Sequence, residues 1–105
     1  MSYQIILTEQ AKGDLAEIYH YIAANLCSPH NAENQILRLE KEIFSLNEMP
    51  ERYRFYDNIK WRERNLHIMP VDHYVVLYVP SVPENTVTIL RVMYGGRDLG
   101  KQLGL

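Results

Sequence analysis

The sequence predicts an α+β fold with the element order β-α-α-β-β-β, in which a two-helix hairpin packs on one face of an antiparallel sheet. Three observations predict this fold. A short apolar run lies near the start, two amphipathic stretches with helical spacing follow within residues 8–49, and three apolar, strand-like runs lie within residues 66–94. A strand that precedes the helical hairpin is free to pair with the later strands, so we expect a single sheet.

The first strand and the first helix are expected directly after one another. Residues 3–7 form a short apolar, β-branched run. Thr8 is a suitable N-cap, and apolar residues recur after it at helical spacing, namely Ala11, Leu15, Ile18, Tyr19 and Ile22. This pattern predicts a helix of about four turns. Its acidic residues, Glu9, Asp14 and Glu17, are expected on the solvent side.

A second helix is expected after a short interruption at residues 25–27. Ser28 offers a capping hydroxyl, and Pro29 suits the first helical position. One apolar stripe then continues through Ala32, Ile36, Leu39, Ile43 and Leu46. Pro50 ends the pattern near Met49. Two amphipathic helices joined by so few residues predict an antiparallel hairpin.

Three strands are expected in the second half of the chain, over residues 66–69, 74–79 and 86–94. Asp72-His73 suits a turn between the first two strands, and residues 80–85 suit a hairpin loop because they contain two prolines and an asparagine. Gly95-Gly96 ends the last strand.

Residues 52–64 show neither the helical nor the strand spacing of apolar residues, and we expect them to form an irregular basic and aromatic segment. Its arginines are Arg52, Arg54, Arg62 and Arg64, with Tyr53, Phe55, Tyr56 and Trp61 among them. This composition is typical of a surface that stacks bases and binds phosphates. We favour the alternative that the aromatic side chains cover the core, because a long irregular segment beside a small sheet needs apolar anchors.

Composition predicts one compact domain over residues 1–105. A hydrophobic fraction of 47% with 23% charged residues argues against disorder. We expect a cytoplasmic protein, because no apolar run is long enough to span a bilayer, the first seven residues do not fit a signal peptide, and a single cysteine, Cys27, fits a reducing compartment. Residues 1–50 carry a net charge of −4 and residues 51–105 one of +2, so an acidic partner is expected on the second half.

Common catalytic and ligand-binding motifs are absent from the sequence. No glycine-rich phosphate loop, nucleophile elbow or metal-ligand spacing is present, so neither a metal nor a cofactor is expected. A cationic set remains in the second half of the chain, with Tyr74 and Tyr94 near it in sequence. It consists of Arg62, Arg64, His67, Arg91, Arg97 and Lys101.

Metal-free cleavage of RNA needs a base, an acid and fixed cations that stabilise the phosphorane. Arginine suits the last role because its planar fork binds two phosphate oxygens. His67 is the nearby group whose ordinary pKa makes it a ready proton carrier. The structural alternatives are that Arg91 points outward into solvent and that His67 is a half-buried strand residue.

Four segments of the sequence, taken together, resemble the RelE/ParE superfamily of bacterial toxins, which belong to type II toxin–antitoxin systems. These segments are residues 5–23, 49–53, 70–78 and 87–98. The resemblance covers nearly the full chain, and the element order expected above is the order of that family. It implies a toxin that is neutralised by a cognate acidic antitoxin in a toxin–antitoxin hetero-oligomer.

The resemblance leaves two targets. ParE-like members inhibit DNA gyrase, whereas RelE-like members are metal-free endoribonucleases that cut mRNA on the ribosome. For a nuclease, the resemblance places Arg97 at a catalytic arginine and His67 at the position of a second one, with Arg91 and Tyr94 as further candidates. For a gyrase inhibitor, the contact residues are Arg97, Tyr94, Arg52, Arg54, Arg62 and Arg64.

The sequence departs from the nuclease pattern. Residues 100–105 contain neither the tyrosine nor the histidine that moves protons in the nucleases, so Tyr94 would have to replace it. The long helical hairpin and the Arg97-Asp98 ending are more similar to the ParE branch. We therefore expect a ParE-like growth inhibitor that acts on gyrase, with the RelE-like nuclease as the alternative.

Overall fold

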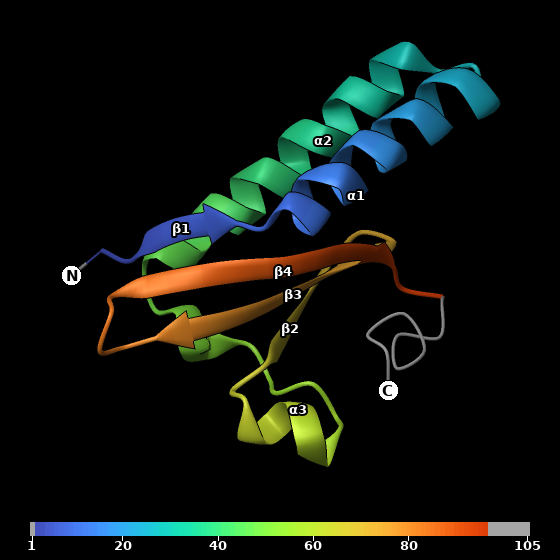
Figure 1. Ribbon diagram of the computed structural model, residues 1–105. Helices are drawn as coiled ribbons and strands as arrows, with labels where there is room; N and C mark the ends of the chain where they lie inside the picture. Colours follow the sequence, from blue (N-terminus) through green and yellow to red (C-terminus); the bar gives the residue numbers. More distant parts are fainter. Residues whose placement is uncertain (1, 97–105) are drawn as a thin grey trace.

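A helical hairpin covers one face of a four-stranded sheet in the computed structural model, which describes residues 2–96 (Figure 1). The chain forms β1 (Gln4–Leu7), α1 (Glu9–His20), α2 (Pro29–Phe44), the short α3 (Ile59–Glu63), β2 (His67–Val71), β3 (Tyr74–Ser81) and β4 (Thr86–Tyr94). The strand order in the sheet is β1-β4-β3-β2. The predicted α+β class and the order of the two long helices and four strands are confirmed, and α3 is an addition to it.

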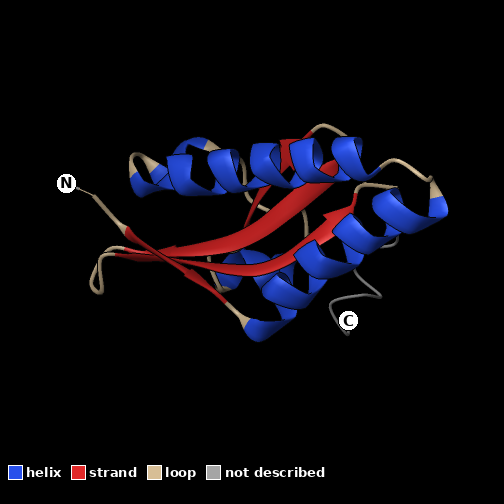
Figure 2. Cartoon of the chain, turned by 90° about the horizontal axis from the view of Figure 1, so that it is seen from above, coloured by secondary structure: helices blue, strands red, loops and turns tan. Residues whose placement is uncertain are grey.

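The sheet is mixed, which corrects the expectation of an antiparallel sheet. The pairs β2–β3 and β3–β4 are antiparallel, but β1 pairs with β4 in parallel. The physical reason is the path of the chain. Two antiparallel helices return the chain to the end of the sheet where β1 began, and two further reversals make β4 start at that same end (Figure 2).

Both long helices begin where the sequence predicts, but only the first has the predicted side-chain cap. The Thr8 hydroxyl accepts a hydrogen bond from the N–H of Ala11 at 3.0 Å. A π-helical turn over Tyr21–Asn25 then extends α1. Ser28 makes no side-chain capping bond, because its ψ of 71° lies outside the extended conformation that directs a capping hydroxyl into the first turn. Pro29 at the first helical position therefore marks the start of α2 without help from Ser28.

The second helix ends earlier than the apolar pattern suggested. Regular α-helix stops at Phe44, and a 3₁₀ turn over Ser45–Asn47 carries Leu46 into the core. Met49 adopts a left-handed conformation with φ of 49°, and the proline that follows it disfavours the right-handed helical region that would continue the helix.

Residues 53–66 cross to the opposite face of the sheet and are more regular than expected. Asn58 caps α3 by accepting from the N–H of Trp61, and Phe55 forms an isolated antiparallel bridge with His67. Tyr56 and Trp61 pack on the apolar side chains of this face, whereas Tyr53 packs on the core beneath the long helices. The prediction that the aromatic side chains of this segment cover the core is therefore supported for three of the four.

The sheet has an apolar cluster on each face. The larger lies between the sheet and the long helices and includes Leu39, Ile43, Val76, Tyr78 and Ile89. The smaller lies under α3 and consists of Leu66, Ile68, Leu77 and Met93 with partly buried neighbours. Within residues 2–96, no helix is long and apolar enough to cross a lipid bilayer.

Candidate functional site

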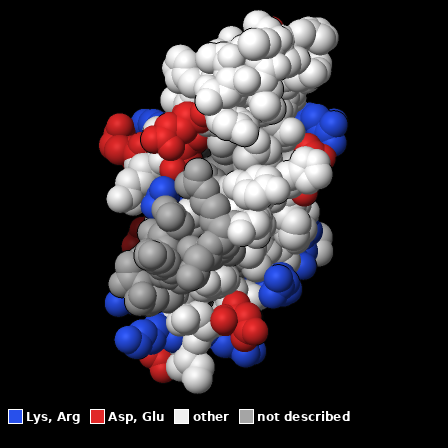
Figure 3. Space-filling view, turned by 90° about the vertical axis from the view of Figure 1, so that its right-hand side faces the viewer, with Lys and Arg blue, Asp and Glu red and all other residues white. Residues whose placement is uncertain are grey.

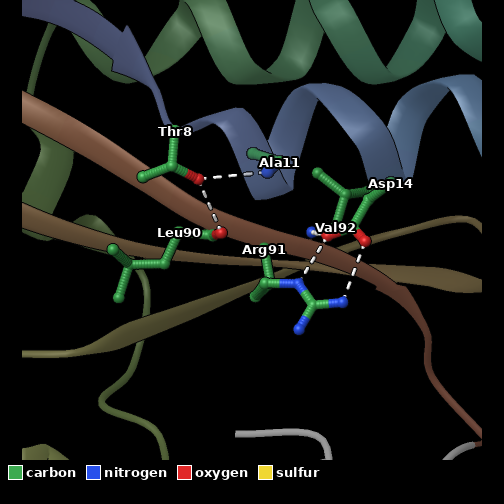
Figure 4. Close-up of polar contacts among 6 residues, drawn as sticks. All are labelled: Thr8, Ala11, Asp14, Leu90, Arg91 and Val92. Atoms are coloured by element: carbon green, nitrogen blue, oxygen red, sulfur yellow. Dashed lines mark hydrogen bonds and ion pairs between the residues drawn. The ribbon is translucent and has the colours of Figure 1, made fainter.

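The outer edge of β4 is closed by side chains of α1. Because β1 pairs only with the first four residues of β4, no strand within residues 2–96 lies beside residues 90–94 on that edge. Thr8 Oγ1 donates to the carbonyl of Leu90 at 2.9 Å, and the Asp14 carboxylate accepts from the N–H of Val92 at 2.9 Å (Figure 4). Side chains of α1 thus bind backbone groups that a neighbouring strand would otherwise bind.

Arg91 and Asp14 form a bidentate ion pair at this edge. Arg91 Nε lies 2.7 Å from one Asp14 oxygen and Nη2 lies 2.9 Å from the other. The hydrogen bonds to Asp14 raise the pKa of Arg91. Figure 4 shows the arginine leaving β4 below the strand and reaching the carboxylate of α1 above it. Asp14 therefore does not face solvent and Arg91 is not a solvated strand residue, which corrects both expectations.

A register shift explains the geometry of this edge. Leu77 of β3 lies opposite Arg91, whereas the next residue, Tyr78, lies opposite Ile89. Leu90 is therefore the extra residue of a β-bulge. The bulge lets the carbonyls of both Ile89 and Leu90 face α1, where they accept from the backbone N–H and the hydroxyl of Thr8 respectively.

Tyr94 ends β4 beside a cavity. It lies opposite Tyr74 in the sheet, and the two rings meet edge to face with centroids 6.1 Å apart. Burial raises the pKa of Tyr74, and the neighbouring hydroxyls of Tyr21 and Tyr94 raise it further. These three tyrosines line a cavity of about 640 Å³ between α1 and the end of the sheet.

His67 is buried inside the protein rather than half-buried. The residue is 3% exposed, and its Nδ1 lies 2.8 Å from the carbonyl oxygen of Tyr53. The imidazole stacks between Phe55 and Tyr78, with centroid separations of 4.5 and 5.4 Å. Its Nε2 has no hydrogen-bond partner within residues 2–96. The stacking and the Tyr53 contact assign His67 a packing role.

Three arginines of the basic segment lie over aromatic rings. Arg52 lies over Tyr53, Arg62 over Phe55 and Arg64 over Trp61, with guanidinium carbons 4.9 to 5.1 Å from the ring centroids. Arg62 thereby extends the stack of Phe55, His67 and Tyr78 to the surface. Arg54 is exposed on the same segment.

Arg52 has a structural role at the end of α2. Its Nη1 donates to the carbonyl of Glu48 at 2.7 Å and, at 3.3 Å, to those of Ser45 and Met49. Its Nη2 donates to the hydroxyl of Ser45 at 2.8 Å. A guanidinium at this position satisfies carbonyl groups that the end of a helix leaves without partners.

The ParE toxin family matches residues 5–99 of the sequence, under the description "ParE toxin of type II toxin-antitoxin system, parDE". The chain belongs to the ParE toxin family. It is a toxin of a type II toxin–antitoxin system. No curated protein sequence matches at a significant level.

Solved toxin structures share the fold of this ParE-family toxin. A chain of the chromosomal ParDE system from P. aeruginosa superposes with a TM-score of 0.69 at 14% identity, covering 89% of this chain and 96% of that one. A RelBE toxin–antitoxin complex from Mycobacterium tuberculosis gives 0.66 at 20% identity, with 90% and 92% covered. A mutant of E. coli RelE in the free state gives 0.67 at 11% identity, with 97% and 93% covered. At these identities the likeness shows the fold alone.

The fold of this ParE-family toxin does not bring the described candidate residues into one site. Across β3, His67 lies opposite Tyr78, whereas Tyr94 lies opposite Tyr74. These two positions of β3 are four residues apart, about 13 Å at the rise of a strand. Arg91 lies between them, bound to Asp14. Arg97 and Lys101 lie outside the described residues.

Sequence reasoning missed the residues that organise the β4 edge. An acidic residue on an amphipathic helix is expected on the solvent side, which does not hold for Asp14, and the second bond of Thr8, to Leu90, has no sequence signal. One signal was available for Asp14. It lies three residues after Ala11, which is fully buried, so helical spacing places it on the buried side.

Proposed function

We propose that this ParE-family toxin arrests growth by binding DNA gyrase rather than by cleaving mRNA. We further propose that a cognate acidic antitoxin neutralises it within a toxin–antitoxin hetero-oligomer. The similar solved structures support the partner, because they are structures of ParDE and RelBE toxin–antitoxin systems and complexes. The net charge of +2 on residues 51–105 favours an acidic partner.

The observation that carries the gyrase proposal is the state of His67 and Arg91. RNA cleavage without a metal needs a proton carrier that reaches the substrate and a cation free to bind phosphate. His67 is buried with its Nδ1 against the Tyr53 carbonyl, and the charge of Arg91 is balanced by Asp14. Both residues are thus occupied by contacts that stabilise the fold, which favours a toxin that works by binding.

The proposed contact surface comprises exposed residues of two regions. Arg54, Arg62 and Arg64 are exposed around α3, and Tyr94 is 52% exposed at the end of β4. We add Arg97, which follows Gly95-Gly96, from the family resemblance. Arg52 belongs to this set by composition, but its hydrogen bonds to the end of α2 and the turn after it favour a structural role.

Two measurements after the same brief induction in a bacterial host test the proposal. We expect growth to stop while primer extension on an abundant transcript shows no new 5′ ends, and we expect purified toxin to inhibit ATP-dependent supercoiling by gyrase. Arg97→Ala should weaken both growth arrest and gyrase inhibition while leaving antitoxin binding intact. Relaxation of the same plasmid by a topoisomerase I serves as the control and should be unaffected.

New 5′ ends within codons, appearing before growth stops, would instead establish a RelE-like, ribosome-dependent endoribonuclease and overturn the proposal. A fully toxic Arg97→Ala variant would remove Arg97 from the contact surface. A chain that causes no arrest and binds no antitoxin would contradict both parts of the proposal.

A further inference from the structure

The cavity between α1 and the end of the sheet is lined by an unusual set of side chains. Its walls include three tyrosines, Tyr21 from the π-helical turn, Tyr74 from β3 and Tyr94 from β4. Ile18 and Leu26 add apolar surface. Leu26, Tyr21 and Tyr94 are each more than half exposed, although they are large apolar or aromatic side chains. A set of exposed aromatic side chains around a cavity favours ligand binding over core packing.

Two of the three rings that line the cavity, those of Tyr74 and Tyr94, do not pack face to face. Tyr74 and Tyr94 meet at an interplanar angle of 78°, which leaves the ring faces in different directions. Tyr21 lines the same cavity from the helical side, and its hydroxyl raises the pKa of Tyr74. The faces of phenol rings carry negative electrostatic potential and attract cations.

The acidic side chains that line the cavity give it a net negative charge beside the aromatic rings. Asp14 and Glu17 both line it from α1, but the charge of Asp14 is balanced by Arg91. Glu17 is exposed, and its charge, like that of Asp14, raises the pKa of Arg91. Figure 3 shows the face at this end of the molecule, where acidic side chains gather on one side of a large uncharged surface and Lys or Arg side chains lie on the opposite side. Within residues 2–96, the two carboxylates and Arg91 therefore leave one net negative charge beside the aromatic rings.

We propose that this cavity binds the side chain of an arginine carried by a peptide segment of the antitoxin. The inference rests on the proposed antitoxin partner and names the chemistry of one contact. A guanidinium stacks on a tyrosine ring and binds a carboxylate in the same plane, which fits the rings and Glu17 together. A volume of about 640 Å³ also admits an apolar neighbour of that arginine against Ile18 and Leu26.

Peptide binding to the isolated toxin tests the charge of the ligand. The probes are Ac-Leu-Arg-Leu-NH₂ and the same peptide with citrulline, which has the same shape without the charge, titrated into the ¹⁵N-labelled full chain. We expect the arginine peptide to shift the signals of Tyr21, Tyr74 and Tyr94, and citrulline to weaken binding by about five- to tenfold, the range of a cation–π contact with a carboxylate. Equal binding of both peptides would overturn the proposal.

A matched pair of variants tests the site. Glu17→Gln should weaken binding of the arginine peptide about fivefold, whereas Glu33→Gln, which changes an exposed glutamate of α2 away from the cavity, should leave it unchanged. Loss of peptide binding at high toxin concentration, with a doubled mass in sedimentation, would overturn the proposal in favour of a second copy of this chain.

Antitoxin binding separates this inference from the proposed function. The probe is the acidic protein encoded next to the toxin gene, co-expressed with the toxin. If it binds the original chain and Glu17→Gln equally well, the cavity proposal fails and the antitoxin proposal stands. If it does not bind the original chain, the antitoxin proposal itself fails.

Discussion

Asp14 of α1 and Arg91 of β4 lie 77 positions apart in the sequence and form a bidentate ion pair at the edge of the sheet. The same carboxylate accepts from the backbone N–H of Val92. One side chain thus joins the first helix to the last strand and satisfies a strand-edge donor.

Asp14→Ala is expected to destabilise the protein by about 2–3 kcal/mol, because it leaves a partly buried guanidinium and a backbone N–H without their acceptor. Asp14→Asn should cost less, since its amide oxygen still accepts from Val92. Urea unfolding followed by circular dichroism measures both. Glu9→Gln is the control, because Glu9 pairs with Lys12 on the surface with 93% of its side chain exposed, and should change stability very little. Equal effects of the three substitutions would contradict this assignment.

The burial of Tyr78 leads us to expect that the protein loses stability in alkaline solution. Its hydroxyl donates to the carbonyl of Pro50 at 2.6 Å, and burial raises its pKa above the ordinary value of 10. Above pH 10 the unfolded chain releases this proton and the folded chain retains it, so the free energy of unfolding falls by about 1.4 kcal/mol per pH unit from this group. Below pH 10 the stabilisation is fully present.

The variant Tyr78→Phe isolates that contribution. We expect it to be about 1–2 kcal/mol less stable at pH 7, because the Pro50 carbonyl loses its donor, and to show a shallower decline of stability above pH 10. Denaturant unfolding between pH 7 and pH 11 measures the slope. Tyr19→Phe, at an exposed position of α1, is the matched control and should keep the original slope. An unchanged slope in Tyr78→Phe would show that another group causes the decline.

Substitution of His67 tests whether this residue has a packing role or a catalytic role. We expect His67→Ala to lower stability by about 2–3 kcal/mol, because it removes a ring stacked between Phe55 and Tyr78 and leaves a cavity. Growth arrest per folded molecule should persist, since the imidazole is buried. Titrated induction with quantification of folded toxin measures this ratio. Complete loss of toxicity in a variant that is folded at the growth temperature would restore His67 as a catalytic candidate.

Substitutions of Arg52 and Arg54 are expected to affect different properties, stability and target binding respectively. Arg52→Ala should lower stability by about 1–2 kcal/mol, because carbonyls after α2 lose a charged donor. Arg54→Ala should leave unfolding unchanged and weaken target binding, because its side chain is exposed. Thermal unfolding and the gyrase supercoiling assay, run on both variants, distinguish the two roles. The reverse pattern would assign the contact to Arg52.

Much of the fold followed from local sequence patterns. The helical periods around Ala11 and Leu39, the cap at Thr8 and the turn at Asp72-His73 act over a few residues, so a single sequence displays them. The short α3 was missed because five residues give too little periodicity to recognise.

The fold class, the element order and the family resemblance can be predicted from the sequence, because periodicity, caps and turns are local and their order along the chain is visible. The parallel pairing of β1 with β4, the bond from Asp14 to Arg91 and the burial of His67 are visible in the folded chain alone. These depend on which distant segments share an edge or a face. The same carboxylate is a solvated charge on an isolated helix and an ion-pair partner beside a strand edge, so its role follows from the neighbours that the fold supplies.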